Sequence, residues 1–288
     1  MQPIPEQPDL YAALRASGVD PANLAALISA SPSAVARRLL SVDQGLLRAI
    51  LRAGNGWAAV PTAYPAMHYL QTVTPEPLFR PDVAASPTLC LPTNGQHPDM
   101  PAFSDRAFDD WFAAKGVPYG IGLYGERRRV YATPQFADQA SPERRTIHLG
   151  IDVFAPAGTP LYAPLPGTVL HLTYNADPLD YGHTLILEHE GNGVRFYTLY
   201  GHLGGSLPKL LAPGARVEVG QHIADLGDWH ENGGWAPHVH FQIITDMLSQ
   251  RRGNFFGVGH ESLWDIWQQI SPDPNLILRL PDTAFKLS

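Results

Sequence analysis

Three short strings decide the fold: TIHLGIDVFA at residues 146–155, LYGHL at residues 199–203 and APHVHFQI at residues 236–243. Each shows the alternation, or the short apolar run bounded by glycine or proline, that is typical of a β-strand. Similar segments recur through residues 146–246 without helical patterns between them. This spacing predicts a mainly β domain, an antiparallel sheet of sandwich or barrel-like form.

The same strings carry an unusual set of nitrogen and oxygen donors. Side chains alternate along a strand, so His238 and His240 project to one face. His148 and Asp152 would also point the same way along an extended strand, with Gly150 relieving the crowding between them. His148, Asp152 and one of the paired histidines would make a three-ligand site that suits Zn²⁺, one per chain, with a fourth position open. The other histidine of the pair and His202 are then available for proton transfer.

The rest of the chain divides into four parts. Residues 1–60 have helical periodicity and predict a helical section that packs on the main domain or on a protein partner. Residues 61–118 are proline-rich and predict a strap or linker with one helix, within 103–116, and a strap that covers the site is one hypothesis. Residues 119–248 form the β domain, in which the ERRR run at 126–129 is expected on a solvated strand edge. Residues 249–288 predict a C-terminal helix and a tail.

Composition limits the remaining options. The 288 residues have a formal net charge of -7, which argues against a broad nucleic-acid surface. Cys90 is the single cysteine, so no intramolecular disulfide framework and no cysteine-rich metal site can form. No apolar run is long enough for a membrane span, and the N-terminus has no signal-peptide pattern. These features predict a cytoplasmic protein, with export to the envelope by another route as the alternative.

Together, the strings IHLGIDVFAPAGTPLYAPLPGTV, FYTLYGHL and APHVHFQI closely resemble the LytM/lysostaphin family of zinc endopeptidases. The resemblance covers roughly residues 146–246. It implies a β-rich fold with a long open groove and cleavage of peptidoglycan cross-bridges or stem peptides. Matched by motif position, it implies that His148, Asp152 and His240 bind zinc, and that His202 and His238 act beside the metal as acid/base groups.

Three further residues are weaker candidates for substrate contact. His230 precedes the paired histidines on a loop, and loops often carry binding groups. Trp235 and Tyr181 are aromatic residues that could line a groove.

Other functions stay open on the sequence. One is a non-catalytic scaffold or regulator that keeps the fold, and another is a module that binds peptides without cutting them. The stretch from about 119 onward, with the tail SPDPNLIL, also resembles family modules embedded in large multidomain bacterial proteins beside kinase-like and aminotransferase-like domains. That resemblance favours a third alternative, a cytoplasmic peptidase or amidase with a substrate outside the cell wall.

Overall fold

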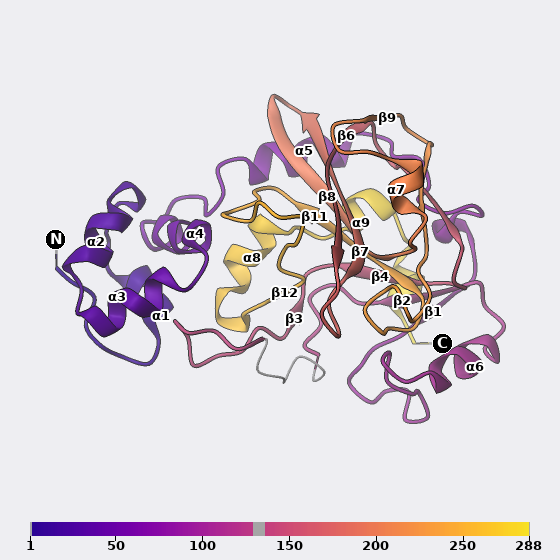
Figure 1. The fold of residues 1–288 in the computed structure, drawn as a ribbon, viewed down its shortest axis with the longest axis horizontal. Coiled ribbons are helices and arrows are strands. Elements are labelled where there is room, and N and C mark those ends of the chain that lie inside the picture. Colours follow the sequence, from indigo (N-terminus) through magenta and orange to yellow (C-terminus); the bar gives the residue numbers. More distant parts are fainter. Residues whose placement is uncertain (1, 129–135, 288) are drawn as a thin grey trace.

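The computed structural model describes residues 2–128 and 136–287, and eight strands of this part form one sheet (Figure 1). Their spatial order is β1-β2-β4-β11-β8-β7-β6-β9. The bounds are β1 Thr88–Cys90, β2 Tyr119–Gly122, β4 Ile151–Phe154, β6 Gly167–Asn175, β7 Gly182–Gly191, β8 Val194–Leu203, β9 Arg216–Val217 and β11 His238–Ile244. All neighbouring pairs are antiparallel except β1 and β2, which are parallel. The predicted mainly β fold is confirmed.

Two small sheets complete the β domain. One pairs β5 (Pro160–Tyr162) with β10 (His222–Asp225), and the other pairs β3 (Ile147–His148) with β12 (Val258–Gly259). His148 and Asp152 therefore lie on two separate strands, β3 and β4, with Leu149 and Gly150 between them. The single extended strand expected from the sequence is wrong here, because β3 leaves the main sheet to pair with β12.

Strand β11 lies near the middle of the sheet, and all seven of its residues are buried. Its odd-numbered members, Val239, Phe241 and Ile243, belong to the main hydrophobic core together with Ile151 and Val153 of β4. The even-numbered polar side chains, such as His240, must then project to the opposite face of the sheet. This alternation leaves one face for packing and one for polar groups.

The first part of the chain is helical, as expected. Its helices lie at one end of the molecule in Figure 1: α1 Leu10–Ala16, α2 Leu24–Ala30, α3 Ser33–Leu40 and α4 Gln44–Gly54. They share a hydrophobic cluster with α8 (Trp264–Ile270), and Arg15 bonds to Asp265 of that helix. The C-terminal region adds a second short helix, α9 (Asn275–Leu278), to the one expected there.

The proline-rich part differs from the expectation of one helix. It contains α6 (Ala107–Ala113) and also α5 (Ala63–Thr72), which includes Pro65. The prediction missed α5 because proline usually ends a helix, but in the first turn its missing amide hydrogen is not needed. The same part supplies β1, so it forms an edge strand of the main sheet.

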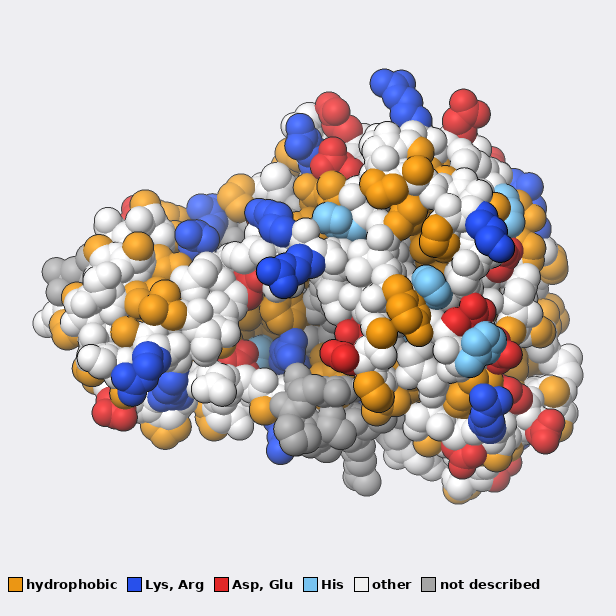
Figure 2. Space-filling model, viewed as in Figure 1, with side chains coloured by type: hydrophobic (Ala, Val, Ile, Leu, Met, Phe, Trp, Pro, Cys, Tyr) orange, Lys and Arg blue, Asp and Glu red, His pale blue; other side chains and the backbone are white. Residues whose placement is uncertain are grey.

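On the face shown in Figure 2, basic and acidic side chains are interspersed and form no broad basic surface. Among the described residues, no helix combines the length and apolar character that crossing a membrane requires.

Candidate metal centre

Strand register brings distant donors together. In the β4–β11 pair, Asp152 lies directly opposite His240, and in the β11–β8 pair, His240 lies opposite Gly201. Residues directly opposite on antiparallel strands have neighbouring side chains. His148 reaches the same point from β3, so three strands contribute to one cluster.

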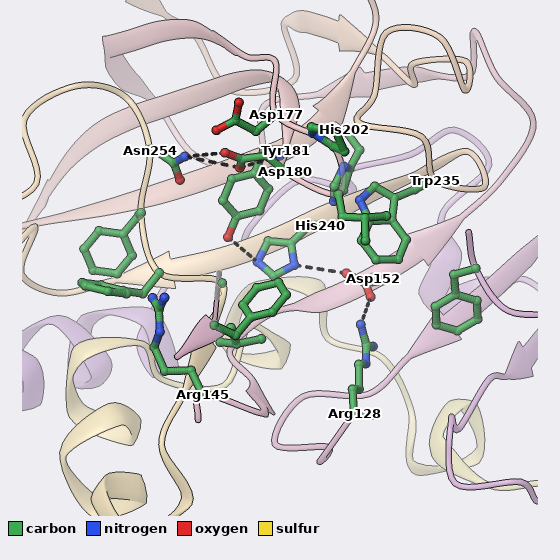
Figure 3. A pocket seen from close by; sticks show the side chains of 18 of the residues that line it. Arg128, Arg145, Asp152, Asp177, Asp180, Tyr181, His202, Trp235, His240 and Asn254 are labelled. Carbon is green, nitrogen blue, oxygen red and sulfur yellow. Dashed lines mark hydrogen bonds and ion pairs between the residues drawn. The ribbon is translucent and has the colours of Figure 1, made fainter. Parts of the chain in front are cut away.

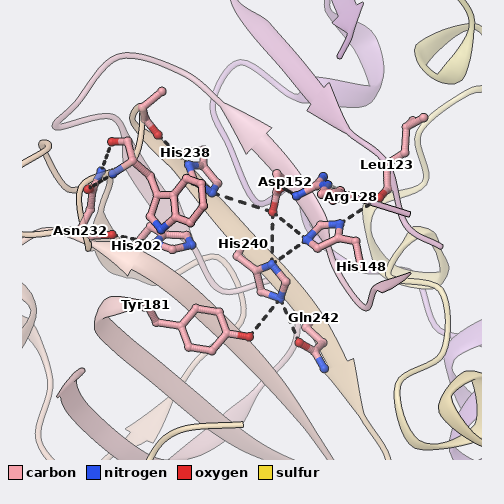
Figure 4. Close-up of polar contacts among 12 residues, drawn as sticks. Leu123, Arg128, His148, Asp152, Tyr181, His202, Asn232, His238, His240 and Gln242 are labelled. Carbon is pink, nitrogen blue, oxygen red and sulfur yellow. Dashed lines mark hydrogen bonds and ion pairs between the residues drawn. The ribbon is translucent and has the colours of Figure 1, made fainter. Parts of the chain in front are cut away.

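The three donor atoms lie very close to one another (Figure 4). His148 Nε2 is 2.9 Å from His240 Nδ1, and Asp152 Oδ1 is 3.2 Å from each of these nitrogens. All three side chains are buried. They are the group of His, Cys, Asp and Glu residues that can hold a metal ion within the described part of the chain.

The second nitrogen of each imidazole fixes its tautomer. His148 Nδ1 donates to the Leu123 carbonyl oxygen at 2.8 Å. His240 Nε2 donates to Gln242 Oε1 at 2.9 Å, because the Gln242 amide nitrogen itself donates to the Phe256 carbonyl and to Ser271. Both remaining ring nitrogens thus present lone pairs to each other and to an anionic oxygen. Three converging acceptors repel one another unless a cation lies between them, so the donor set fits a metal ion.

Electrostatics agree with this assignment. Burial and the charge of Arg128 lower the pKa of His148 to about 4, so its imidazole is neutral. Burial acts to raise the pKa of Asp152, but His148 and the Arg128 guanidinium outweigh it and hold that pKa well below its ordinary value. A neutral imidazole and an ionised carboxylate are the forms that bind metal.

His202 and His238 stand beside the three donors, with ring centroids 4.3 Å apart. Each is anchored through Nδ1, which donates to the carbonyl of Asn232 for His202 and of Ala236 for His238. Burial lowers the pKa of His238 to about 4, and burial with the neighbouring His238 holds the pKa of His202 well below its ordinary value. Both rings are therefore neutral, and with Nδ1 as the donor each carries its lone pair on Nε2.

The backbone of His202 is strained. Its φ is 63°, in the left-handed region that non-glycine residues rarely adopt. The amide of His202 donates to the Tyr181 carbonyl, and its own carbonyl accepts from Gly227. Such conformations persist where the surroundings impose them, and here the two backbone hydrogen bonds hold His202 in place beside His238.

A pocket of about 380 Å³ opens over these side chains (Figure 3). Its floor includes Asp152, His202, His238 and His240, and its walls come from the loops at 177–181 and 250–258 and from Arg128, Phe136 and Arg145. Phe103 is the one residue of 61–105 among its lining residues. That residues 61–105 restrict access to the site stays a prediction, to be tested by removal of residues 1–105.

Two of the three weaker candidates reach this pocket. Trp235 and Tyr181 line it; the Tyr181 hydroxyl is 3.5 Å from His240 Nε2, and the buried Trp235 Nε1 has no hydrogen-bond partner among the described residues. The structure does not bring His230 there. Its side chain is 73% exposed and lies 3.7 Å from Asp228, whereas its neighbour Trp229 is buried.

Sequence reasoning missed the groups that support the ligands, namely Leu123, Gln242 and Arg128. Arg128 was expected on a solvated edge, but its side chain is only 3% exposed and its Nη1 lies 2.6 Å from Asp152 Oδ2. Its neighbour Arg127 is exposed as expected, and Arg129 lies outside the described residues. The sequence could have indicated Gln242, since it continues the alternation of His238 and His240 along the strand.

Fold and site together define a β domain with a candidate metal centre. Residues 146–252 match the model of peptidase family M23, and this segment holds the three donors and both further histidines. The resemblance noted from the sequence is confirmed for this segment.

Two curated relatives are similar over the same region. An uncharacterized metalloprotease of Haemophilus influenzae is 36% identical over 96 residues, which is 33% of this chain and 18% of that protein. The peptidoglycan DD-endopeptidase ShyC of Vibrio cholerae is 33% identical over 101 residues, 35% of this chain and 21% of that protein. The chain thus spans about a fifth of the length of the curated relatives it matches.

Solved structures also align with part of the chain. A zinc containing peptidase from Vibrio cholerae is 31% identical, with a TM-score of 0.29, over 39% of this chain and 30% of that one. The catalytic domain of lysostaphin from Staphylococcus simulans is 21% identical, with a TM-score of 0.33, over 54% of this chain and 96% of that one.

Proposed function

We propose that this protein is a zinc-dependent metalloendopeptidase that hydrolyses peptide bonds, with peptidoglycan cross-bridges or stem peptides as its substrate. The observation that carries the proposal is the convergence of three acceptor atoms, Nε2 of His148, Oδ1 of Asp152 and Nδ1 of His240, at an open pocket that Asp152 and His240 line. The family match of residues 146–252 supports peptidase chemistry, and the similarity to ShyC supports peptidoglycan.

The hydrogen bonds suggest which residues would bind the metal and which would transfer protons. His148, Asp152 and His240 would hold the zinc, which when bound lowers the pKa of a coordinated water to about 7 and polarises a carbonyl. His202 and His238 would move protons, because each has Nδ1 anchored and Nε2 available. One of them accepts a proton as water adds to the scissile carbonyl, and the proton passes to the amine as the carbon–nitrogen bond breaks.

Zinc stoichiometry and hydrolysis of purified peptidoglycan test the proposal together. We expect the wild type to bind one zinc and to cut. His240→Ala should lose the metal, whereas His238→Ala should keep it and lose turnover. His222→Ala is a matched control, because His222 bonds to Asp225 away from the pocket and should change neither quantity.

Two outcomes would favour the alternatives. Zinc binding without cleavage of peptidoglycan, but with cleavage of cytoplasmic peptides, would favour a peptidase or amidase outside the cell wall. A wild type that binds no zinc would favour the scaffold or peptide-binding functions. A protein partner for the helices α1–α4 is a separate proposal, which co-purification of the intact chain and of a chain lacking residues 1–60 would test.

A further inference from the structure

Arg128 joins two carboxylates in the interior of the domain. Its Nη1 lies 2.6 Å from Asp152 Oδ2, and its Nε lies 3.1 Å from Glu126 Oε2. Glu126 is itself fixed, since its Oε1 accepts the amide of Thr93 at 2.6 Å. The Asp152 side chain is 2% exposed, so its contact with Arg128 is shielded from water. An arginine held by one carboxylate has little freedom to turn away from the other.

The backbone leaves room for this contact. Gly122 of β2 lies directly opposite Asp152 of β4. A side-chain carbon at Gly122 would come within 2.8 Å of Arg128 Nη2 and 3.0 Å of Asp152 Oδ2. The absence of a side chain there lets the guanidinium reach Asp152. The ring of Phe103 then covers the guanidinium, 5.7 Å from its central carbon.

The two oxygens of Asp152 consequently have different surroundings. Oδ1 faces His148 Nε2 and His240 Nδ1 at 3.2 Å, whereas Oδ2 faces Arg128 (Figure 4). A carboxylate that offers one oxygen fills one coordination position, and a carboxylate that offers both fills two. A catalytic zinc site has to keep a position open.

We infer that Arg128 is a positioning residue that restricts Asp152 to binding the metal through Oδ1 alone and so keeps a coordination position open. Glu126 anchors it, and Gly122 gives it space. All three precede residues 146–252, so the metal centre extends beyond the segment that matches the family model. The inference rests on the proposed metal site and deepens it.

The test uses the full chain stripped of metal and titrated with zinc or cobalt(II) alone. Cobalt(II) commonly replaces zinc, and its visible absorption weakens as its coordination number rises above four. For Arg128→Met, we expect a 10–100-fold weaker zinc affinity, as is typical when a group that orients a ligand is lost, and a weaker cobalt absorption. Arg128→Lys keeps the charge but lacks the planar guanidinium that contacts both carboxylates. It should therefore restore neither the zinc affinity nor the cobalt absorption fully.

Two variants complete the design. Glu126→Gln preserves shape and should weaken zinc binding by a smaller factor, which keeps the test informative if Arg128→Met fails to fold. Arg127→Met is the matched control, because the Arg127 side chain is 70% exposed and pairs with Glu261. It should match the wild type in both titrations.

The outcomes separate the two proposals. If the wild type binds neither ion, the proposed function and this inference both fall. If the wild type binds both ions, and the folded Arg128 and Glu126 variants have the same zinc affinity and the same cobalt spectrum as the wild type, only the inference about Arg128 is overturned.

Discussion

Gln242 offers the sharpest test of how the proposed metal ligands are oriented. Its side chain is fully buried and makes three hydrogen bonds, at 2.9 Å from His240 Nε2, 3.0 Å to the Phe256 carbonyl and 2.8 Å to Ser271 Oγ. Gln242→Leu introduces an apolar side chain of similar size and removes all three hydrogen bonds. His240 then loses the acceptor that fixes its proton on Nε2 and its lone pair on Nδ1.

The expected loss has two parts. Removing such a partner typically weakens metal affinity by about 10–100-fold, which is about 1.4–2.7 kcal/mol. The free energy of unfolding of the metal-free protein should also fall by roughly 1–3 kcal/mol for each buried group left without a partner, with the Phe256 carbonyl first among them. Competition with a chromophoric zinc chelator measures the first quantity, and urea unfolding measures the second.

Gln242→Glu separates the two effects. The carboxylate still accepts from His240 Nε2, so zinc affinity should stay within about threefold of the wild type. It cannot donate to the Phe256 carbonyl, so stability should fall. Gln269→Leu is a control outside the pocket, where the same substitution removes the bond from the Ala59 amide and should leave zinc affinity unchanged. Equal loss of zinc affinity in Gln242→Leu and Gln242→Glu would refute the reasoning and reduce Gln242 to a packing role.

Three further predictions follow from single contacts. Gly150→Ala should abolish stable zinc binding in a metal titration, because the added carbon would lie 2.5 Å from His240 Cε1 and 2.9 Å from the Phe241 carbonyl; wild-type affinity would contradict this. Trp235→Phe keeps a ring but removes the buried, unpartnered N–H of a residue that lines the pocket, so kcat/KM on purified peptidoglycan should fall by about 5–10-fold at unchanged zinc content, and an unchanged kcat/KM would exclude a role in substrate binding. Burial lowers the pKa of His189 from 6.5 to about 4. Between these pH values, His189 is protonated in the unfolded chain and neutral in the folded chain. The shifted pKa of His189 leaves the free energy of unfolding unchanged above pH 6.5 and lowers it as the pH falls toward 4, by on the order of 3 kcal/mol. His189→Gln should flatten that part of the urea-unfolding profile, and parallel profiles would count against the assignment.

The clustering of the three donors could be predicted because their signals are local. Alternation along a strand needs only two residues of spacing, and it places His238 and His240 on one face without any knowledge of the neighbouring strands. The same alternation extends to Gln242, so one supporting residue was also within reach of the sequence. The role of Gly150 was only half predicted. It relieves crowding, but against the His240 ring from another strand rather than between His148 and Asp152.

Arg128 was beyond local reasoning for a physical reason. A run of one glutamate and three arginines has no apolar alternation, and charged runs usually face solvent, so nothing near residue 128 indicates burial. Its position depends on the strand order β2-β4-β11, in which Asp152 faces His240 on one side and Gly122 on the other. One neighbour of β4 thus supplies a proposed metal ligand, and the chain that follows the other neighbour supplies the cation for the second oxygen of Asp152. A ligand whose two oxygens serve different partners needs a strand on each side, so β2 belongs to the metal centre as much as the motif-bearing strands do.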